Sequence, residues 1–163
     1  MKRQATFLNA LLAAGLTIVA TMSLAWADSA KLDELFARLA ASEADEAGRI
    51  EQEIWIEWSK SGSPAMDLLL QRGRDAMQAG DLVTAVDHFT ALIDHSPDFA
   101  EGYNARATAY FQEGQFGPSV ADIARTLALN PRHFGAMAGF GMILEQTDQP
   151  EKALEVYNAA LTI

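Results

Sequence analysis

Residues 100–131 read AEGYNARATAYFQEGQFGPSVADIARTLALNP, and this stretch decides the fold of the chain. Residues 66–97 read MDLLLQRGRDAMQAGDLVTAVDHFTALIDHSP, with the same kinds of residue at the same places. A third and shorter window runs from Phe134 to Ile163. Similarity at a fixed period of 34 residues within one chain indicates stacked units of structure.

Four kinds of position recur at this spacing. Each unit has a small residue early, a second small residue late, a large apolar residue four positions further on, and a closing Pro in the first two units. The recurring residues are Gly73, Ala107 and Gly141; Ala85, Ser119 and Ala153; Phe89, Ile123 and Tyr157; Pro97 and Pro131. Small residues let two helices cross closely, and Pro cannot continue a helix. Each unit is therefore predicted to be two helices, with turns at Gly80 and Gly114 in the first two units.

This register of small, large apolar and proline positions resembles the tetratricopeptide repeat (TPR). The stretches YNARATAYFQEGQF and ALEVYNAAL are especially similar to that family, although Arg106 stands where the family usually has Leu. The resemblance covers residues 66–163 and implies an all-α fold, an α-solenoid of helix-turn-helix repeats. The expected repeats span about 66–99, 100–133 and 134–163, the last of them incomplete.

Residues 28–63 show no clear match to the repeat, but they carry two apolar stripes at helical spacing. We expect a two-helix N-terminal segment here, a helical hairpin that acts as a degenerate or capping repeat. Stacked repeats need atypical terminal units to cover an apolar face. The alternative is that Trp55 and Trp58 form part of a partner-binding patch, since Trp is a frequent interface anchor.

The first 27 residues have the layout of a secretory signal peptide. Lys2 and Arg3 precede the uncharged stretch FLNALLAAGLTIVATMSLA, and AWA follows at residues 25–27. We expect cleavage between Ala27 and Asp28, which would make this an exported bacterial protein that is periplasmic or secreted. The alternative is an uncleaved segment that anchors the chain in a membrane.

Composition argues against several functions. The first 27 residues hold two of the twelve basic residues and none of the 22 acidic ones, so the remainder has a formal net charge of −12 and would repel nucleic acid. Cys is absent, and His88 and His95 lie two helical turns apart, too far to share a metal ion. The acidic residues are expected on helix surfaces, and His133 is expected in a connecting loop with a structural or surface role. No catalytic motif is present, so we expect neither enzyme activity, metal nor cofactor.

The TPR resemblance implies a function in protein binding. In that family the first helix of each repeat lines a concave groove that holds an extended peptide or a helix of another protein. The residues at the groove positions are Leu70, Arg74, Met77, Gln78, Asn104, Thr108, Phe111, Gln112, Ala138, Met142, Glu145 and Gln146. We therefore expect a non-catalytic scaffold of the bacterial envelope with a protein partner.

Two other functions remain open at this point, a self-associating structural subunit and an accessory domain of an envelope complex. The period would place another Pro just beyond Ile163, so the outer face of the last helix is expected to be bare. Either the sequence is a fragment, the interpretation we favour, or this face docks on another subunit.

Overall fold

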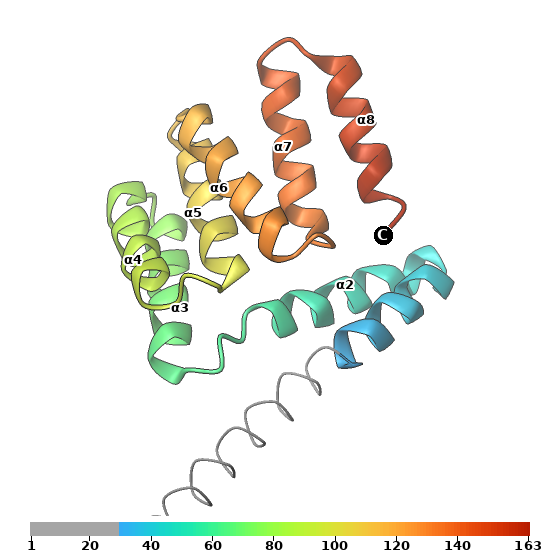
Figure 1. Ribbon diagram of the computed structural model, residues 1–163, viewed down its shortest axis with the longest axis horizontal. Coiled ribbons are helices and arrows are strands. Elements are labelled where there is room, and N and C mark those ends of the chain that lie inside the picture. Colours follow the sequence, from blue (N-terminus) through green and yellow to red (C-terminus); the bar gives the residue numbers. More distant parts are fainter. Residues whose placement is uncertain (1–29) are drawn as a thin grey trace, which may run out of the picture. The chain divides into compact units, whose positions relative to one another are not determined.

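The computed structural model describes residues 30–163, and the predicted signal peptide at residues 1–27 lies outside them (Figure 1). The chain divides into two compact units, Met1–Glu57 and Trp58–Ile163. In the described part of the first unit, residues 30–41 are helical and α2 begins at Ala44 and ends at Trp58. Leu35, Phe36, Ile50 and Ile54 are buried.

Ion pairs join the two helices in the described part of the first unit. Lys31 Nζ lies 2.8 Å from Glu57 Oε2, and an Arg38 nitrogen lies 3.3 Å from Glu53 Oε2. Both partners of the Arg38 pair are largely exposed, so that pair adds little stability.

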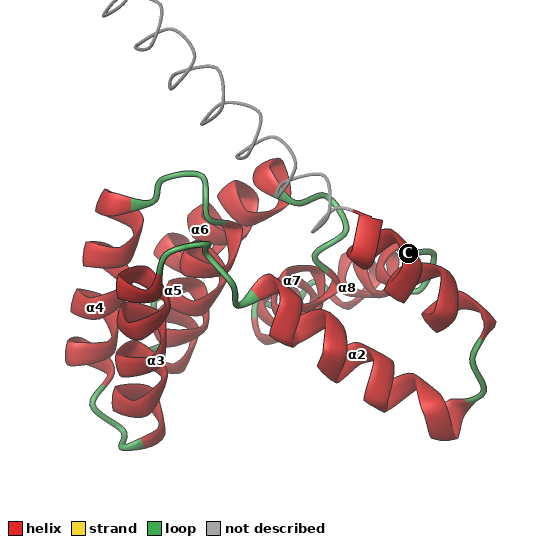
Figure 2. Ribbon diagram, turned by 90° about the horizontal axis from the view of Figure 1, so that it is seen from below, coloured by secondary structure: helices red, strands yellow, loops and turns green. Residues whose placement is uncertain are grey.

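The second unit contains three consecutive helix pairs, which can be followed in Figures 1 and 2. Their bounds are α3 (Pro64–Gln78), α4 (Leu82–His95), α5 (Ala100–Gln112), α6 (Phe116–Leu129), α7 (Phe134–Gln146) and α8 (Pro150–Ala160). Each helix packs against its neighbours in the chain, and α5 also contacts α3 and α7, the first helices of the adjoining pairs. The helices therefore form two layers, with α3, α5 and α7 in one and α4, α6 and α8 in the other. No strand occurs among residues 30–163, and the predicted all-α stack of helix-turn-helix units is confirmed.

The small residues of the repeat lie where two helices of a pair cross. A Cβ added to Gly73 would stand 2.3 Å from Phe89 Cε1, and one added to Gly141 would stand 2.3 Å from Tyr157 Cε1. In the middle pair the hydroxyl of Ser119 donates a hydrogen bond of 2.8 Å to the carbonyl of Ala107. The close crossing inferred from the sequence is therefore present in all three pairs.

The turns and helix ends follow from local backbone requirements. Gly80 and Gly114 have φ of 80° and 73°, values that favour glycine, and Asp148 occupies the same region at 58° in the third turn. The helices before the prolines end at His95 and Leu129. None of the helices in the described part of the chain is both long and apolar enough to cross a membrane.

Candidate functional site

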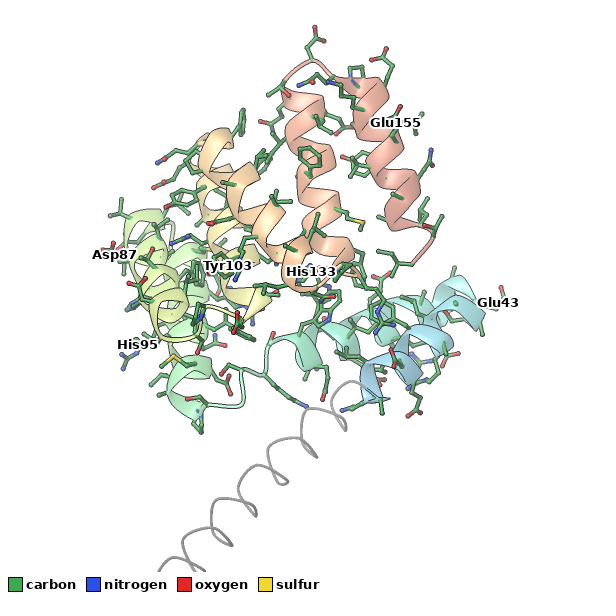
Figure 3. The ribbon with its side chains drawn as sticks, viewed as in Figure 1. Glu43, Asp87, His95, Tyr103, His133 and Glu155 are labelled. Carbon is green, nitrogen blue, oxygen red and sulfur yellow. The ribbon has the colours of Figure 1, made fainter. Side chains whose placement is uncertain are left out.

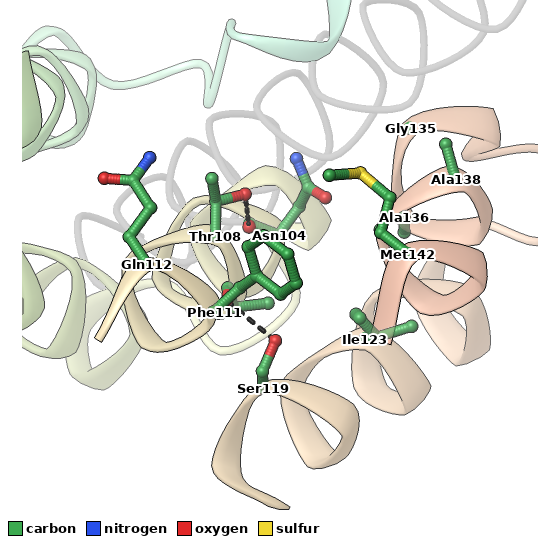
Figure 4. A pocket seen from close by; sticks show the side chains of 12 residues that line it. Asn104, Thr108, Phe111, Gln112, Ser119, Ile123, Gly135, Ala136, Ala138 and Met142 are labelled. Atoms are coloured by element: carbon green, nitrogen blue, oxygen red, sulfur yellow. Dashed lines mark hydrogen bonds between the residues drawn. The ribbon is translucent and has the colours of Figure 1, made fainter. Parts of the chain in front are cut away.

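A pocket of about 280 Å³ opens between α5, α6 and α7 (Figure 4). Its walls are mainly apolar, and none of its lining residues carries a charge. The lining residues are Asn104, Ala107, Thr108, Phe111, Gln112, Ser119, Ile123, Gly135, Ala136, Ala138, Gly139 and Met142. The pocket is thus suited to an apolar group of a ligand rather than to an ion.

Half of the residues at predicted groove positions meet in this pocket. Asn104, Thr108, Phe111 and Gln112 come from α5, and Met142 comes from α7 together with Ala138. In Figure 4 the ring of Phe111 lies near the centre of the lining residues.

The other predicted groove residues lie elsewhere in the second unit. Leu70 is buried in the core with Phe89 and Leu92, and Met77 packs against the same core. Gln78 is exposed at the end of α3, and Gln146 is exposed at the end of α7.

Two charged members of the predicted groove have partners of their own. The guanidinium of Arg74 donates to Ser59 Oγ over 3.0 Å and pairs with Glu101. Glu145 accepts a hydrogen bond of 3.2 Å from the hydroxyl of Tyr157. Desolvation, together with this hydrogen bond, raises the pKa of the phenol. The structure therefore brings together six neutral groove residues of α5 and α7, whereas the charged groove residues lie outside the pocket.

Sequence reasoning missed the residues that open the pocket. Gly135 and Gly139 on α7 leave space, since a Cβ at Gly139 would touch only Ile123 Cδ1, at 3.8 Å. For Ala107, Ser119 and Ile123 the repeat pattern predicts only a role in helix packing. The sequence does contain a signal for the pocket, because α7 has three glycines although glycine is unfavourable inside a helix.

Glu101 lies at the centre of a buried polar network beside the pocket. Its side chain is 3% exposed, which corrects the expectation that acidic residues lie on helix surfaces. One carboxylate oxygen accepts from Arg74, and the other accepts from Asn104 Nδ2 at 3.2 Å and lies 3.0 Å from His133 Nε2. Asp122 is a second buried carboxylate. Burial is tolerated because these acids have cationic partners, which the sequence does not reveal.

His133 caps the start of α7. Its Nδ1 accepts a hydrogen bond of 3.1 Å from the N–H of Ala136, so the proton of the neutral ring is on Nε2 and points to Glu101. The ring is fully buried and stacks on Trp58, with centroids 4.2 Å apart. Figure 3 shows His133 at the lower end of α7, whereas His95 and Asp87 are exposed on α4. His133 therefore has a structural role, and the ring of Trp58 packs against His133 within the second unit.

Arg106 links three helices through a second network. Its guanidinium binds both carboxylate oxygens of Asp122, at 2.7 and 2.9 Å, and donates to Thr90 Oγ1 over 3.0 Å. The hydrogen bond to Asp122 raises the pKa of the guanidinium. The aromatic rings of Tyr103 and Tyr110 lie about 6 Å from the same group. This explains how an Arg replaces the usual apolar residue without loss of packing.

The described residues contain no group of three or more His, Cys, Asp or Glu side chains placed to hold a metal ion. The chemistry that the pocket does offer is apolar contact together with hydrogen bonding by Asn104, Thr108 and Gln112. These are properties of a binding surface.

Comparison with known proteins supports this interpretation. A TPR repeat-containing protein of Rhizobium etli is 36% identical over 134 residues, which are 82% of this chain and 66% of that protein. Human tetratricopeptide repeat protein 36 is 33% identical over 88 residues, 54% of this chain and 45% of that protein. The chain thus spans about half to two thirds of the length of these relatives.

Two solved structures show the same fold. The first TPR domain of Spaghetti (RPAP3), bound to the HSP90 peptide SRMEEVD, is 25% identical with a TM-score of 0.57, over 60% of this chain and 79% of that one. MamA matches with a TM-score of 0.57 and 14% identity, over 80% of this chain and 74% of that one.

A sequence model described as tetratricopeptide repeat matches residues 70–117 and 104–163. These matches together cover more than half of the chain, in the part where the helix pairs stack. The chain therefore belongs to the tetratricopeptide repeat family, whose members are generally non-catalytic modules for protein–protein interaction.

Proposed function

We propose that this protein is a non-catalytic scaffold that holds a peptide or helix of a partner protein against the layer formed by α3, α5 and α7. The observation that carries the proposal is the uncharged pocket, where groove residues of α5 and α7 meet around Phe111. An apolar side chain of the partner fills this pocket, and Gln112 contacts the partner at its rim. The peptide bound by the TPR domain of Spaghetti supports the same class of ligand for this chain.

A random peptide library selected on the wild-type protein tests this proposal. Met142 is 45% exposed, so Met142→Glu places a charge at the pocket with little effect on folding. The control is Val83→Glu, at an exposed apolar position on α4 that lies outside the pocket and is 68% exposed. We expect the selected peptides to bind Met142→Glu at least about tenfold more weakly, a loss of about 1.4 kcal/mol, and to bind the control like the wild type. Equal binding to Met142→Glu and wild type would refute the site.

The proposed location is the bacterial envelope, either the periplasm or the medium. It is supported by the layout of residues 1–27, in which a basic start, an uncharged apolar stretch and AWA follow one another. Expression of the full chain in a bacterium, followed by fractionation and N-terminal sequencing, tests this proposal. We expect the exported protein to begin at Asp28, and an intact chain confined to the cytoplasm would contradict it.

A second candidate function is self-association through the outer face of α8. Leu154 and Leu161 are 60% and 85% exposed, whereas Val120 and Leu127, one repeat earlier, pack against the core. Light scattering after size-exclusion chromatography would show a concentration-dependent oligomer. A Leu154→Lys, Leu161→Lys variant would then be monomeric, and a monomeric wild type at all concentrations would exclude this candidate.

A further inference from the structure

We infer that the pocket between α5, α6 and α7 selects a peptide segment that brings an apolar side chain together with an N–H donor, and that it rejects a carboxylate. This inference rests on the proposed function of the pocket as the place where a partner binds. It adds the chemistry of the ligand, which follows from the direction of the hydrogen bonds made by the lining residues.

The orientation of the Asn104 amide is fixed by Glu101. The carboxylate of Glu101 accepts from the guanidinium of Arg74, and it also accepts from His133, whose proton must lie on Nε2 because its Nδ1 accepts from a backbone N–H. A carboxylate surrounded by donors has only acceptor sites to offer. Asn104 must therefore turn its NH₂ group toward Glu101, at 3.2 Å, and its carbonyl oxygen away from it.

The carbonyl oxygen of Asn104 is consequently presented to the pocket. In Figure 4 this oxygen lies on the side that faces Met142, whereas the nitrogen points away. Asn104 is nearly buried, so the side chain has little freedom to reverse. The α5 wall thus has a fixed hydrogen-bond acceptor near the apolar space.

The two hydroxyl groups of the lining are acceptors as well. Thr108 donates its proton to the backbone carbonyl of Asn104 over 2.9 Å, and Ser119 donates its proton to the backbone carbonyl of Ala107 over 2.8 Å. Each hydroxyl has a single proton, so only lone pairs remain for a ligand. Asn104 keeps a second N–H, but it is on the nitrogen that points away from Met142 in Figure 4. Gln112, which is exposed at the rim, also has an amide that can donate.

The charges around the pocket also disfavour an anionic ligand. No Lys or Arg lines the pocket, and the protein has a formal net charge of −10. At the start of α7, where an anion would ordinarily be favoured, the N–H of Ala136 is already bonded to His133 Nδ1, and the negative charge of Glu101 lies at the other nitrogen of that ring. A ligand carboxylate would lose its water without gaining a cation, and Gln112 at the rim would be its side-chain donor, whereas a peptide N–H would gain an acceptor inside the pocket.

Three small probes with one common tail separate these possibilities. 4-Methylpentanamide, 4-methylpentylamine and 4-methylpentanoate share a branched apolar chain and differ in being a neutral donor, a cationic donor and an anion. Each is titrated into the ¹⁵N-labelled full chain while the amide resonances of Thr108, Gly135 and Gly139 are followed. We expect the amide and the amine to bind at least about tenfold more tightly than the carboxylate, a difference of about 1.4 kcal/mol.

The outcomes distinguish this inference from the proposed function. If 4-methylpentanoate binds as tightly as the amide, the preference for a donor is wrong while the pocket remains a binding site. If none of the probes shifts these resonances, the pocket itself fails as a ligand site, and the proposed function fails with it.

A matched pair of variants tests whether the acceptor groups of the pocket wall cause the preference for a ligand with an N–H donor. Thr108→Val removes an acceptor from the wall without touching Glu101. Its control is Thr147→Val, because Thr147 makes the same bond to the carbonyl four residues earlier and lies outside the pocket. We expect Thr108→Val to weaken amide binding about threefold or more and to leave carboxylate binding unchanged, with no effect of the control. An unchanged ratio of the two affinities in Thr108→Val would overturn the inference.

Discussion

The crossing of α3 and α4 at Gly73 makes a single methyl group a direct test of the packing. In Gly73→Ala the new Cβ would stand 2.3 Å from Phe89 Cε1 and 2.6 Å from Cδ1. Carbon atoms prefer separations of about 3.5–4.0 Å, so the ring would have to move by about 1.5 Å. Phe89 is fully buried among Leu70, Leu92 and alanines, which leaves no space for such a movement.

The expected loss of stability follows from two opposing contributions. Overpacking of a filled core costs about 3 kcal/mol at a site that cannot relax. Alanine is favoured over glycine inside a helix by about 1 kcal/mol, which offsets part of that cost. We therefore expect Gly73→Ala to lower the free energy of unfolding by about 2 kcal/mol.

Two other glycines provide matched comparisons. A Cβ at Gly141 meets Tyr157 at the same 2.3 Å, but that ring is partly exposed and can turn outward. Gly141→Ala should therefore change stability by less than about 1 kcal/mol, because the helix preference offsets the strain. Gly48 on α2 has no atom within 4 Å of an added Cβ, so Gly48→Ala should stabilise the protein by about 1 kcal/mol.

Urea unfolding followed by circular dichroism at 222 nm measures all three variants. With a slope of about 1.5 kcal/mol per molar urea, Gly73→Ala should lower the midpoint by about 1.3 M. Unchanged slopes would show that the same structure unfolds in each variant. The packing argument is refuted if Gly73→Ala is as stable as the wild type, or if Gly141→Ala is the more damaging of the two.

Three further substitutions test other contacts by urea or thermal unfolding. Arg106→Met leaves the nearly buried Asp122 without its partner and should cost about 3 kcal/mol, most of which Asp122→Leu in the same chain should restore; an undiminished loss would contradict the pairing. Ser119→Val should be more destabilising than Ser119→Ala, because it adds volume at a crossing where Ala only removes one hydrogen bond; the reverse order would contradict the close approach. Hydrogen bonds to Thr84 lower the pKa of Asp81 below its ordinary value in the folded protein. The stability that this carboxylate contributes is therefore present above about pH 4 and is lost as the pH falls through the lowered pKa. Asp81→Asn should lose less stability in this range, and parallel acid unfolding of both proteins would contradict that role.

The repeat itself was open to prediction because its causes are local or periodic. The left-handed backbone of Gly80 and Gly114 and the helix ends before Pro97 and Pro131 follow from properties of single residues. The crossing at Gly73 follows from the 34-residue period, which places small residues opposite large ones in each unit. The stacked helix pairs therefore follow from the pattern, and the resemblance to the TPR family identifies the stack as an α-solenoid.

The candidate site was predictable only in part. The groove register placed Asn104, Thr108 and Phe111 on one helix face, and the structure brings them to the pocket. The same register also included Leu70, which is buried in the core. A register gives the direction of a side chain, but the depth of the neighbouring helix decides whether that side chain is covered.

The sequence by itself thus determined the all-α repeat, its boundaries at glycine and proline, and the close crossing within each pair. Only the tertiary structure decided that Glu101 is buried, that it accepts from Arg74 and His133 across the stack, and that Asn104 therefore presents its oxygen to the pocket. The physical reason is that helix pattern and turn geometry depend on neighbours in the chain. Burial of a charge and the direction of an amide depend on partners from other helices, whose distances no sequence spacing specifies.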